Sequence, residues 1–186
     1  MVRNLSSVPP SYVDGTRLWV DSRLRALVQR REAAILRRLG GAVPGGTVLE
    51  LGTGRRGTGL RLALDAFGAG RAEGIDRYAG SVEASRAAVR DLGRRVDVRE
   101  GDATGLAAAA ESYDAVFGYH VLHHAEAWRD VVGEAARVLR PGGRFYSCEL
   151  TAKFVDSRLL RAVAFHPPTA TGPPRPGWPR LAATRG

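Results

Sequence analysis

The chain has 186 residues, of which 44% are apolar and 25% charged, with a net charge of +9. This size predicts one domain with its own core, and no run approaches the ~18–20 apolar residues of a membrane span. Its single cysteine, Cys148, excludes an intramolecular disulfide, favours the cytoplasm and fits a small core residue. The basic residues are nearly all arginines spread along the chain, which favours a solvated surface over nucleic-acid binding.

Residues 1–44 are expected to form an N-terminal helical lid. Apolar residues recur at helical spacing over residues 16–39, with arginines at the other positions, and Gly40-Gly41 ends the pattern. A basic amphipathic helix can lie on an anionic membrane. Asp21 and Glu32 interrupt the basic face, however, and this favours packing against the domain that follows.

Residues 45–165 alternate between strand and helix patterns and are expected to form the core domain. Strands are predicted at 47–51, 72–76, 95–99, 113–119 and 143–150. Helices are predicted near 58–68, 80–92, 124–139 and 154–164, with a short one around 104–110. This order predicts an α/β fold with a doubly wound, mostly parallel sheet, which binds ligands beyond the carboxyl ends of its strands.

The glycine-dense loop within residues 47–60 is the clearest functional signal. A short apolar strand pattern leads into Gly52, Gly54 and Gly57, which have the G-x-G-x-x-G spacing of a nucleotide-binding loop. Asp76 ends the second predicted strand and could accept hydrogen bonds from the ribose of an adenosine-containing cofactor. Capping of the next helix is the alternative role for this carboxylate.

Four further features appear in a fixed order and distinguish between possible cofactors. They are an acid two residues before the first glycine, an acid just beyond the third strand, the opening of the fourth strand, and a helix-to-strand turn: Glu50, Asp102, Ser112–Phe117 and Arg137–Phe145. Together with the loop they resemble the class I S-adenosylmethionine-dependent methyltransferase family, of the small-molecule type, over residues 45–150.

The resemblance implies a Rossmann-like fold that binds S-adenosylmethionine and transfers its methyl group to a small organic acceptor. It implies that Glu50 and the loop backbone hold the methionine part, Asp76 the ribose, and Asp102 the adenine amine, with Ala103 beside the ring. The alternative for Asp102 is a cap on the short helix predicted after it. The implied cofactor-binding residues are Glu50, Gly52, Thr53, Gly54, Gly57, Asp76, Arg77, Gly101, Asp102, Ala103 and Tyr119.

The loop departs from the family's usual G-x-G-x-G pattern, because Arg56 stands at the third position and glycine is delayed to Gly57. Either the loop is wider, or Gly57 and Gly59 serve at shifted positions. The literal G-x-G-x-x-G spacing keeps an NAD-dependent oxidoreductase as an alternative. No Tyr-x-x-x-Lys pair supports hydride transfer, and the only lysine, Lys153, follows the fifth predicted strand.

Three histidines follow the fourth predicted strand, where the resemblance places the transferring methyl group. His120 is predicted to line the methyl site, with His123 or His124 as a possible base, because imidazole has a suitable pKa. Packing and helix capping are the alternative roles. No metal site is predicted here, because the H-x-x-H-H spacing lacks a nearby cysteine or a clear set of carboxylates.

The end of the chain loses acidic residues and gains prolines, so residues 166–186 are expected to be a disordered, Pro-rich tail. The family's last two strands are expected to be missing. An open sheet edge would then favour a homodimer. A frameshifted or otherwise incomplete terminus near His166-Pro167 is expected, and a non-catalytic, truncated methyltransferase-like protein is a further alternative.

Overall fold

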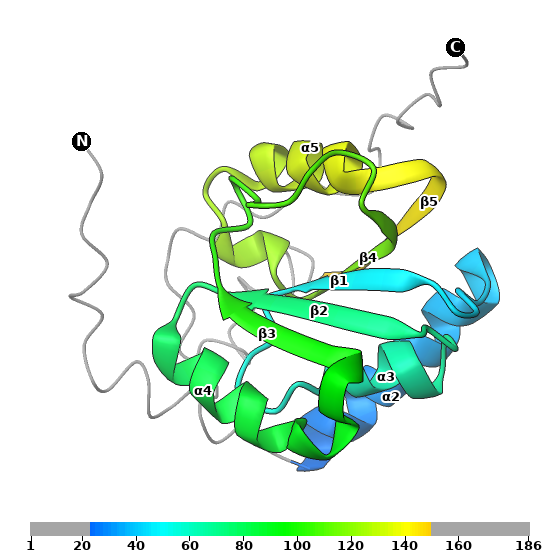
Figure 1. Ribbon diagram of the computed structural model, residues 1–186, viewed down its shortest axis with the longest axis vertical. Coiled ribbons are helices and arrows are strands. Elements are labelled where there is room, and N and C mark those ends of the chain that lie inside the picture. The colour runs from blue at the N-terminus through cyan, green and yellow to red at the C-terminus, as the bar shows by residue number, and fades with distance from the viewer. Residues whose placement is uncertain (1–22, 150–186) are drawn as a thin grey trace, which may run out of the picture.

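The computed structural model describes residues 23–149, which form a parallel five-stranded sheet in the order β3-β2-β1-β4-β5 (Figure 1). β1 lies between β2 and β4, so the direction of winding reverses there, and sheets of this kind generally bind ligands beyond the carboxyl ends of the strands at that point. This confirms the predicted doubly wound α/β fold. The strands are Thr47–Leu51 (β1), Arg71–Asp76 (β2), Val96–Glu100 (β3), Tyr113–Tyr119 (β4) and Leu139–Cys148 (β5).

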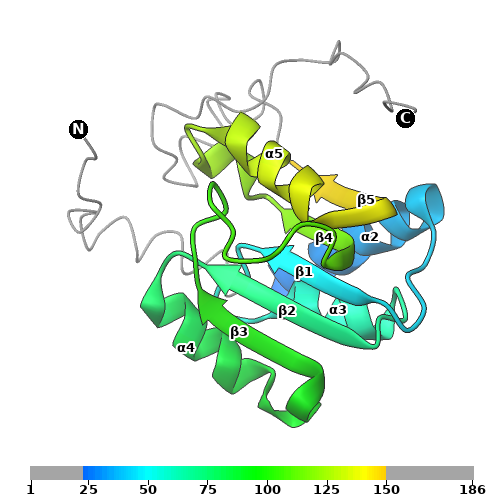
Figure 2. The ribbon, with the colours of Figure 1, turned by 45° about the horizontal axis from the view of Figure 1, so that its top comes forward.

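Helices cover both faces of the sheet, with α2, α3 and α4 on one side and α5 on the other (Figure 2). Within residues 23–149, every helix is too short or too polar to cross a lipid bilayer. The α-helices are Arg23–Gly40 (α2), Thr58–Asp65 (α3), Ala79–Ala88 (α4) and Trp128–Val138 (α5), and the 3-10 helices are Arg90–Arg95 (η2) and Leu122–His124 (η3).

The alternation of side chains along β1 divides the interior into two cores. Val48 packs on the side of α2, α3 and α4, whereas Leu49 and Leu51 pack on the side of α5. Because successive strand residues point to opposite faces, Glu50 must share the face of Val48 and lie beneath α3. The sheet therefore directs a carboxyl group into an apolar core, near the carboxyl end of β1.

Helix α2 packs against β5 and α3, and the apolar pattern predicts its packing face only in part: Leu36 packs against the core as expected. Ala33 and Gln29 are buried, while four apolar residues of the expected stripe are exposed: Leu24, Leu27, Ile35 and Leu39. The expectation that this stripe packs inward is therefore wrong for these residues. The Tyr146 hydroxyl donates to the carbonyl oxygens of Gly40 and Gly41, at 2.9 Å each, and fixes the end of the helix on β5.

The short helix predicted around 104–110 is absent from the structure, which has turns there. Three backbone groups of this segment bond to side chains of α5. Leu106 N–H donates to Glu134 Oε2 at 2.7 Å, and Arg137 donates to the carbonyl oxygens of Leu106 and Ala108. Side chains of a distant helix thus replace the hydrogen bonds that a local helix would supply.

Several other boundaries differ from the predictions, among them the end of α4, at Ala88 rather than 92. β5 begins at Leu139 rather than 143, with a register shift opposite Tyr113 and Ala115, and α5 begins at Trp128 because residues 122–124 form η3. The predictions for residues 1–22, for a helix at 154–164, for two missing strands and for a disordered 166–186 tail lie outside the described residues.

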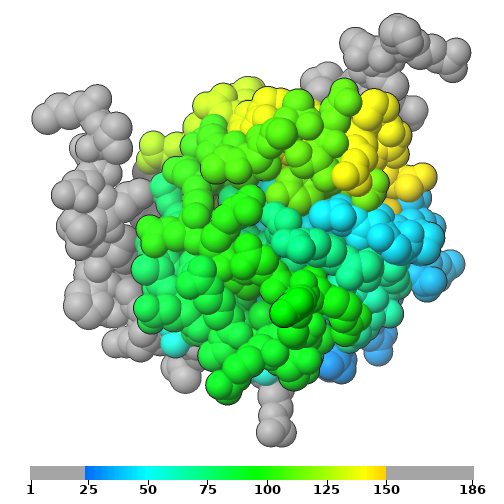
Figure 3. Space-filling view, viewed as in Figure 1, coloured from blue at the N-terminus to red at the C-terminus, as the bar shows by residue number. Residues whose placement is uncertain are grey.

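β3 is one edge of the described sheet, and Figure 3 shows it with the chain that follows (green) at the molecular surface. Val98 is its only buried residue. The charged residues Asp97, Arg99 and Glu100 discourage pairing of this edge with a strand of another chain.

Candidate cofactor and acceptor site

The loop after β1 is held against the end of β2 by its backbone. Gly52, Gly54 and Gly57 all have positive φ angles, of 70°, 58° and 55°, which residues with a Cβ rarely adopt. The N–H groups of Gly52 and Thr53 donate to the carbonyl oxygen of Ile75, at 2.9 and 3.1 Å. The glycine spacing therefore corresponds to a real backbone requirement.

Asp76 fastens this loop to β2 through both carboxylate oxygens. Oδ2 accepts the Gly54 N–H at 2.9 Å, and Oδ1 accepts the Tyr78 N–H at 3.0 Å. Burial raises the pKa of Asp76, although these N–H groups act in the opposite direction. Tyr78 is itself the N-cap of α4 and has no side-chain cap, so Asp76 is not the N-cap residue.

Glu50 is the most deeply buried acid of the site, with 2% of its surface exposed. Burial raises its pKa well above the ordinary value, and nearby Asp76 adds to the shift, while a hydrogen bond from the Leu60 backbone opposes it. A Cβ at Gly59 would overlap the Glu50 carboxyl group. The fourth glycine of the loop therefore makes room for this acid, whereas Gly57 is the N-cap of α3.

Two buried polar atoms at this strand end have no hydrogen-bond partner among the described residues: Glu50 Oε2 and Tyr119 Oη. Burial, with Glu50 and Glu32 close by, also raises the pKa of Tyr119. A buried polar atom without a partner costs about 1–3 kcal/mol, so such atoms often mark a ligand site. A ligand with an ammonium group fits this chemistry, because Glu50 can accept from it.

Asp102 lies beyond β3 and closes a turn rather than capping a helix. Its Oδ1 accepts from the N–H and hydroxyl of Thr104, at 2.9 and 2.8 Å, and these bonds lower its pKa. Arg77 approaches Oδ2 at 3.5 Å, and Gly101 N–H donates to the carbonyl oxygen of Asp76 at 3.0 Å. Ala103 is partly buried beside them. The helix-capping alternative for Asp102 is wrong, because the helix does not form.

His120 directly follows β4 and contacts Glu32 of α2, which was not among the predicted site residues. Its Nε2 lies 2.7 Å from Glu32 Oε1, and Arg25 of α2 donates to Glu32 Oε2 at 3.2 Å. The His120 N–H donates to the carbonyl oxygen of Cys148 at 2.8 Å. The interruption of the basic helix face at Glu32 was the only sequence signal of this contact.

His123 and His124 occupy different surroundings from His120. Glu149 accepts hydrogen bonds from the N–H groups of Val121 and Leu122, and its Oε2 lies 2.7 Å from His123 Nδ1. Only 2% of the His123 side chain is exposed. The exposed His124 ring lies 4.1 Å from the His123 ring, centroid to centroid. His123 and Glu149 thus fix the turn after β4.

A separate pocket of about 720 Å³ opens between α2, α3 and α4. It shares Arg55 and Arg56 with the glycine loop but includes none of the strand-end carboxylates. Arg55 leans toward the first turn of α4, where it lies 3.5 Å from the Gly80 carbonyl oxygen. We therefore locate the cofactor site by the strand ends and not by this pocket.

Comparison with known proteins identifies the family of the chain. The family described as "Methyltransferase domain" matches residues 49–147. A Mycolicibacterium smegmatis protein named "Probable S-adenosylmethionine-dependent methyltransferase" is 38% identical over 116 residues, which are 62% of this chain and 42% of that protein. An uncharacterized 37.1 kDa protein in transposon Tn4556 of Streptomyces fradiae is 37% identical over 131 residues, 67% of this chain and 37% of the relative.

The chain thus spans less than half the length of these curated relatives. The crystal structure of the YcgJ protein from Bacillus subtilis has a TM-score of 0.59 and 25% identity, and the match covers 66% of this chain and 51% of that one. The cofactor of the matched family is S-adenosylmethionine, which confirms the predicted cofactor. The chain belongs to the class I S-adenosylmethionine-dependent methyltransferase family.

Proposed function

We propose that this chain transfers a methyl group from S-adenosylmethionine to a small organic acceptor at the carboxyl ends of β1 and β4. The observation that supports this most strongly is the pair of buried, unpartnered atoms Glu50 Oε2 and Tyr119 Oη beside the glycine loop. Packing of an apolar core gives these two polar atoms no hydrogen-bond partner, whereas a bound cofactor with an ammonium group would supply one. When bound, the cofactor supplies a methyl group that is activated by its positive sulfur.

On the cofactor side, each residue has a role that follows from its position. Glu50 accepts from the ammonium group of the methionine part, and Thr53 with the loop glycines presents backbone to it. Asp76 has lone pairs beyond those used by Gly54 and Tyr78, and these accept from the ribose hydroxyls. The turn of Gly101, Asp102 and Ala103 receives the adenine, and Arg77 holds Asp102 in place.

On the acceptor side, His120 is the histidine best placed to contact the acceptor. Its Nε2 is paired with Glu32, which leaves Nδ1 to take the proton that the acceptor loses as its new bond to carbon forms. The enzyme otherwise contributes alignment, because methyl transfer is an in-line displacement. His123 acts indirectly, by fixing the turn that carries His120.

The N-terminal segment, residues 1–44, serves as a lid in this proposal. Its described part, α2, carries Arg25 and Glu32 to the end of the sheet. Glu32 would orient His120, and Arg25 would hold Glu32. The cytoplasmic location and a homodimer formed through an open sheet edge remain predictions.

Calorimetric titration with S-adenosylhomocysteine and with NAD tests the proposal. We expect binding of S-adenosylhomocysteine alone, and Asp76→Asn should weaken it at least tenfold. Asp97→Asn, on the exposed face of β3, is the matched control and should leave affinity unchanged. Binding of NAD alone would support the oxidoreductase alternative, and binding of neither would support a non-catalytic protein.

A further inference from the structure

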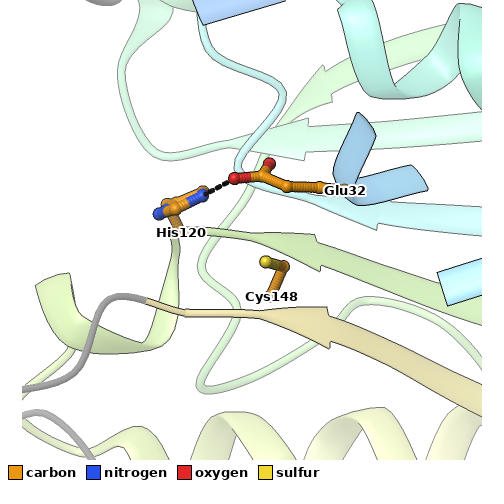
Figure 4. Close-up of side chains that lie close together, drawn as sticks. All are labelled: Glu32, His120 and Cys148. Atoms are coloured by element: carbon orange, nitrogen blue, oxygen red, sulfur yellow. Dashed lines mark hydrogen bonds and ion pairs between the residues drawn. The ribbon is translucent and has the colours of Figure 1, made fainter. Parts of the chain in front are cut away.

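Three side chains of metal-binding chemistry meet at the end of the sheet: Glu32 from α2, His120 after β4 and Cys148 at the end of β5. Figure 4 shows all three pointing toward one another. One ligand atom of each lies within 4.8 Å of the corresponding atoms of the other two. We propose that this Glu32–His120–Cys148 cluster binds a divalent transition-metal ion of the zinc class.

The combination of donors selects the kind of ion. Thiolate, imidazole and carboxylate are the ligands of zinc, whereas magnesium and calcium prefer oxygen ligands alone. In a tetrahedral zinc site with bonds of about 2.0–2.3 Å, the ligand atoms lie about 3.3–3.8 Å apart. Separations below 4.8 Å reach this range through small side-chain movements.

The surroundings already orient the ligands. Arg25 donates to Glu32 Oε2, so Oε1 is the oxygen that faces His120. The His120 N–H bonds the Cys148 carbonyl oxygen and ties the two strand ends together. His120 also has a φ of +59°, a conformation that costs a residue with a side chain about 1–2 kcal/mol. Fixed ligand orientation of this kind is typical of built metal sites.

This cluster supplies what the sequence pattern alone lacked. The H-x-x-H-H spacing predicted no metal site because it lacked a nearby cysteine or a clear set of carboxylates. The fold brings one of each to His120, while His123 is engaged by Glu149 and is not part of the cluster.

Metal binding would change the chemistry of the site. The ion would replace the 2.7 Å contact between His120 and Glu32. The imidazole would then carry its proton on Nδ1 instead of Nε2, and the thiol of Cys148 would lose its proton to solvent. Three protein ligands leave a fourth position for water or an acceptor atom. An imidazole that coordinates metal is a poor base, so metal binding and proton acceptance by His120 are alternative states.

Cobalt titration of the full, tag-free chain tests the site after treatment with EDTA and without any cofactor. We expect one Co²⁺ per chain, the visible bands of tetrahedral cobalt, and a near-ultraviolet thiolate-to-cobalt band that Zn²⁺ abolishes by displacement. Cys148 is the only cysteine of the chain, so this band has a single source.

Variants assign the remaining ligands. Cys148→Ser should remove the thiolate band, and Glu32→Gln and His120→Asn should each weaken cobalt binding at least tenfold. His124→Asn is the matched control, because this exposed histidine lies outside the cluster, and it should leave both band and affinity unchanged. Circular dichroism confirms that each variant is folded.

Cobalt binding without the thiolate band would overturn the proposal. Unchanged affinity in both Glu32→Gln and His120→Asn would overturn it as well. The titration contains no S-adenosyl compound, so a negative result would not affect the proposed methyl transfer. Conversely, failure to bind S-adenosylhomocysteine would not affect the metal site.

Discussion

The two halves of the proposed site are built in different ways. In the cofactor half, the ends of β1 and β2 are joined by contacts between nearby parts of the chain, such as Gly54 to Asp76, 22 residues apart. In the acceptor half, His120 meets Glu32 across 88 residues. The first half consists mainly of backbone amides that meet carboxylates, whereas the contact of His120 with Glu32 in the second half joins two side chains. A local motif can therefore specify the cofactor, whereas the acceptor chemistry depends on how α2 packs.

The largest expected effect separates the halves by removing the proposed base. In the presence of EDTA, His120→Gln should lower kcat about 10²–10⁴-fold, the usual contribution of a general base. The measurement is methyl transfer from labelled S-adenosylmethionine to an acceptor that the wild type methylates. Affinity for S-adenosylhomocysteine should stay within about twofold of wild type.

The matched control for this experiment is His124→Gln, whose ring is exposed. It should lose less than about threefold in kcat. Equal losses of kcat in the two variants would show that His120 does not act as the general base.

Glu50→Gln should break the cofactor half and leave the acceptor half intact. Loss of the buried charge should weaken S-adenosylhomocysteine binding roughly 150- to 5,000-fold in calorimetry, because removing one partner of a buried pair costs about 3–5 kcal/mol. The unliganded variant should be at least as stable as wild type, because a buried carboxylate is unfavourable without its partner. A destabilised variant with normal affinity would make Glu50 a structural residue only.

Gly59→Ala tests whether glycine is needed at position 59 to leave room for the side chain of Glu50. The new Cβ would overlap the Glu50 carboxyl group, and we expect about a tenfold loss of affinity with a lower melting temperature. Gly80→Ala is the control, because open space surrounds that position in α4 and alanine favours helix by up to about 1 kcal/mol. If both changes behave alike, the packing of Glu50 against Gly59 is not the cause.

The smallest effect is a pH dependence that originates at Glu50. Its pKa is raised in the folded chain, so the unfolded state loses the proton first as the pH rises. Stability of the unliganded protein should therefore fall from about pH 4.5 up to the folded pKa and then level off. In parallel melting curves, the advantage of Glu50→Gln should grow over the same range. A constant difference at every pH would contradict the raised pKa.

Much of the fold follows from local patterns in the sequence. The bounds of β1 and β4 agree with the prediction, and the glycine spacing corresponds to three left-handed loop positions. The helix expected at 104–110 fails because Glu134 and Arg137 of α5 satisfy that segment's backbone. The packing face of α2 could be predicted only in part, because Leu36 packs against the core while four other apolar residues of the pattern are exposed.

The candidate site, like the fold, is only partly predictable from the sequence. The positions of Glu50, Asp76 and Asp102 at successive strand ends follow from the strand pattern. The meeting of Glu32, His120 and Cys148 does not, since it depends on three segments that come together only after folding. Sequence spacing carries little information about such contacts.

A crystal structure with S-adenosylhomocysteine tests the central claim most directly. The account predicts the ligand's ammonium group within hydrogen-bonding distance of Glu50, its ribose at Asp76 and its adenine beside the Gly101–Ala103 turn. A ligand bound elsewhere, with Glu50 Oε2 and Tyr119 Oη still lacking partners, would contradict it.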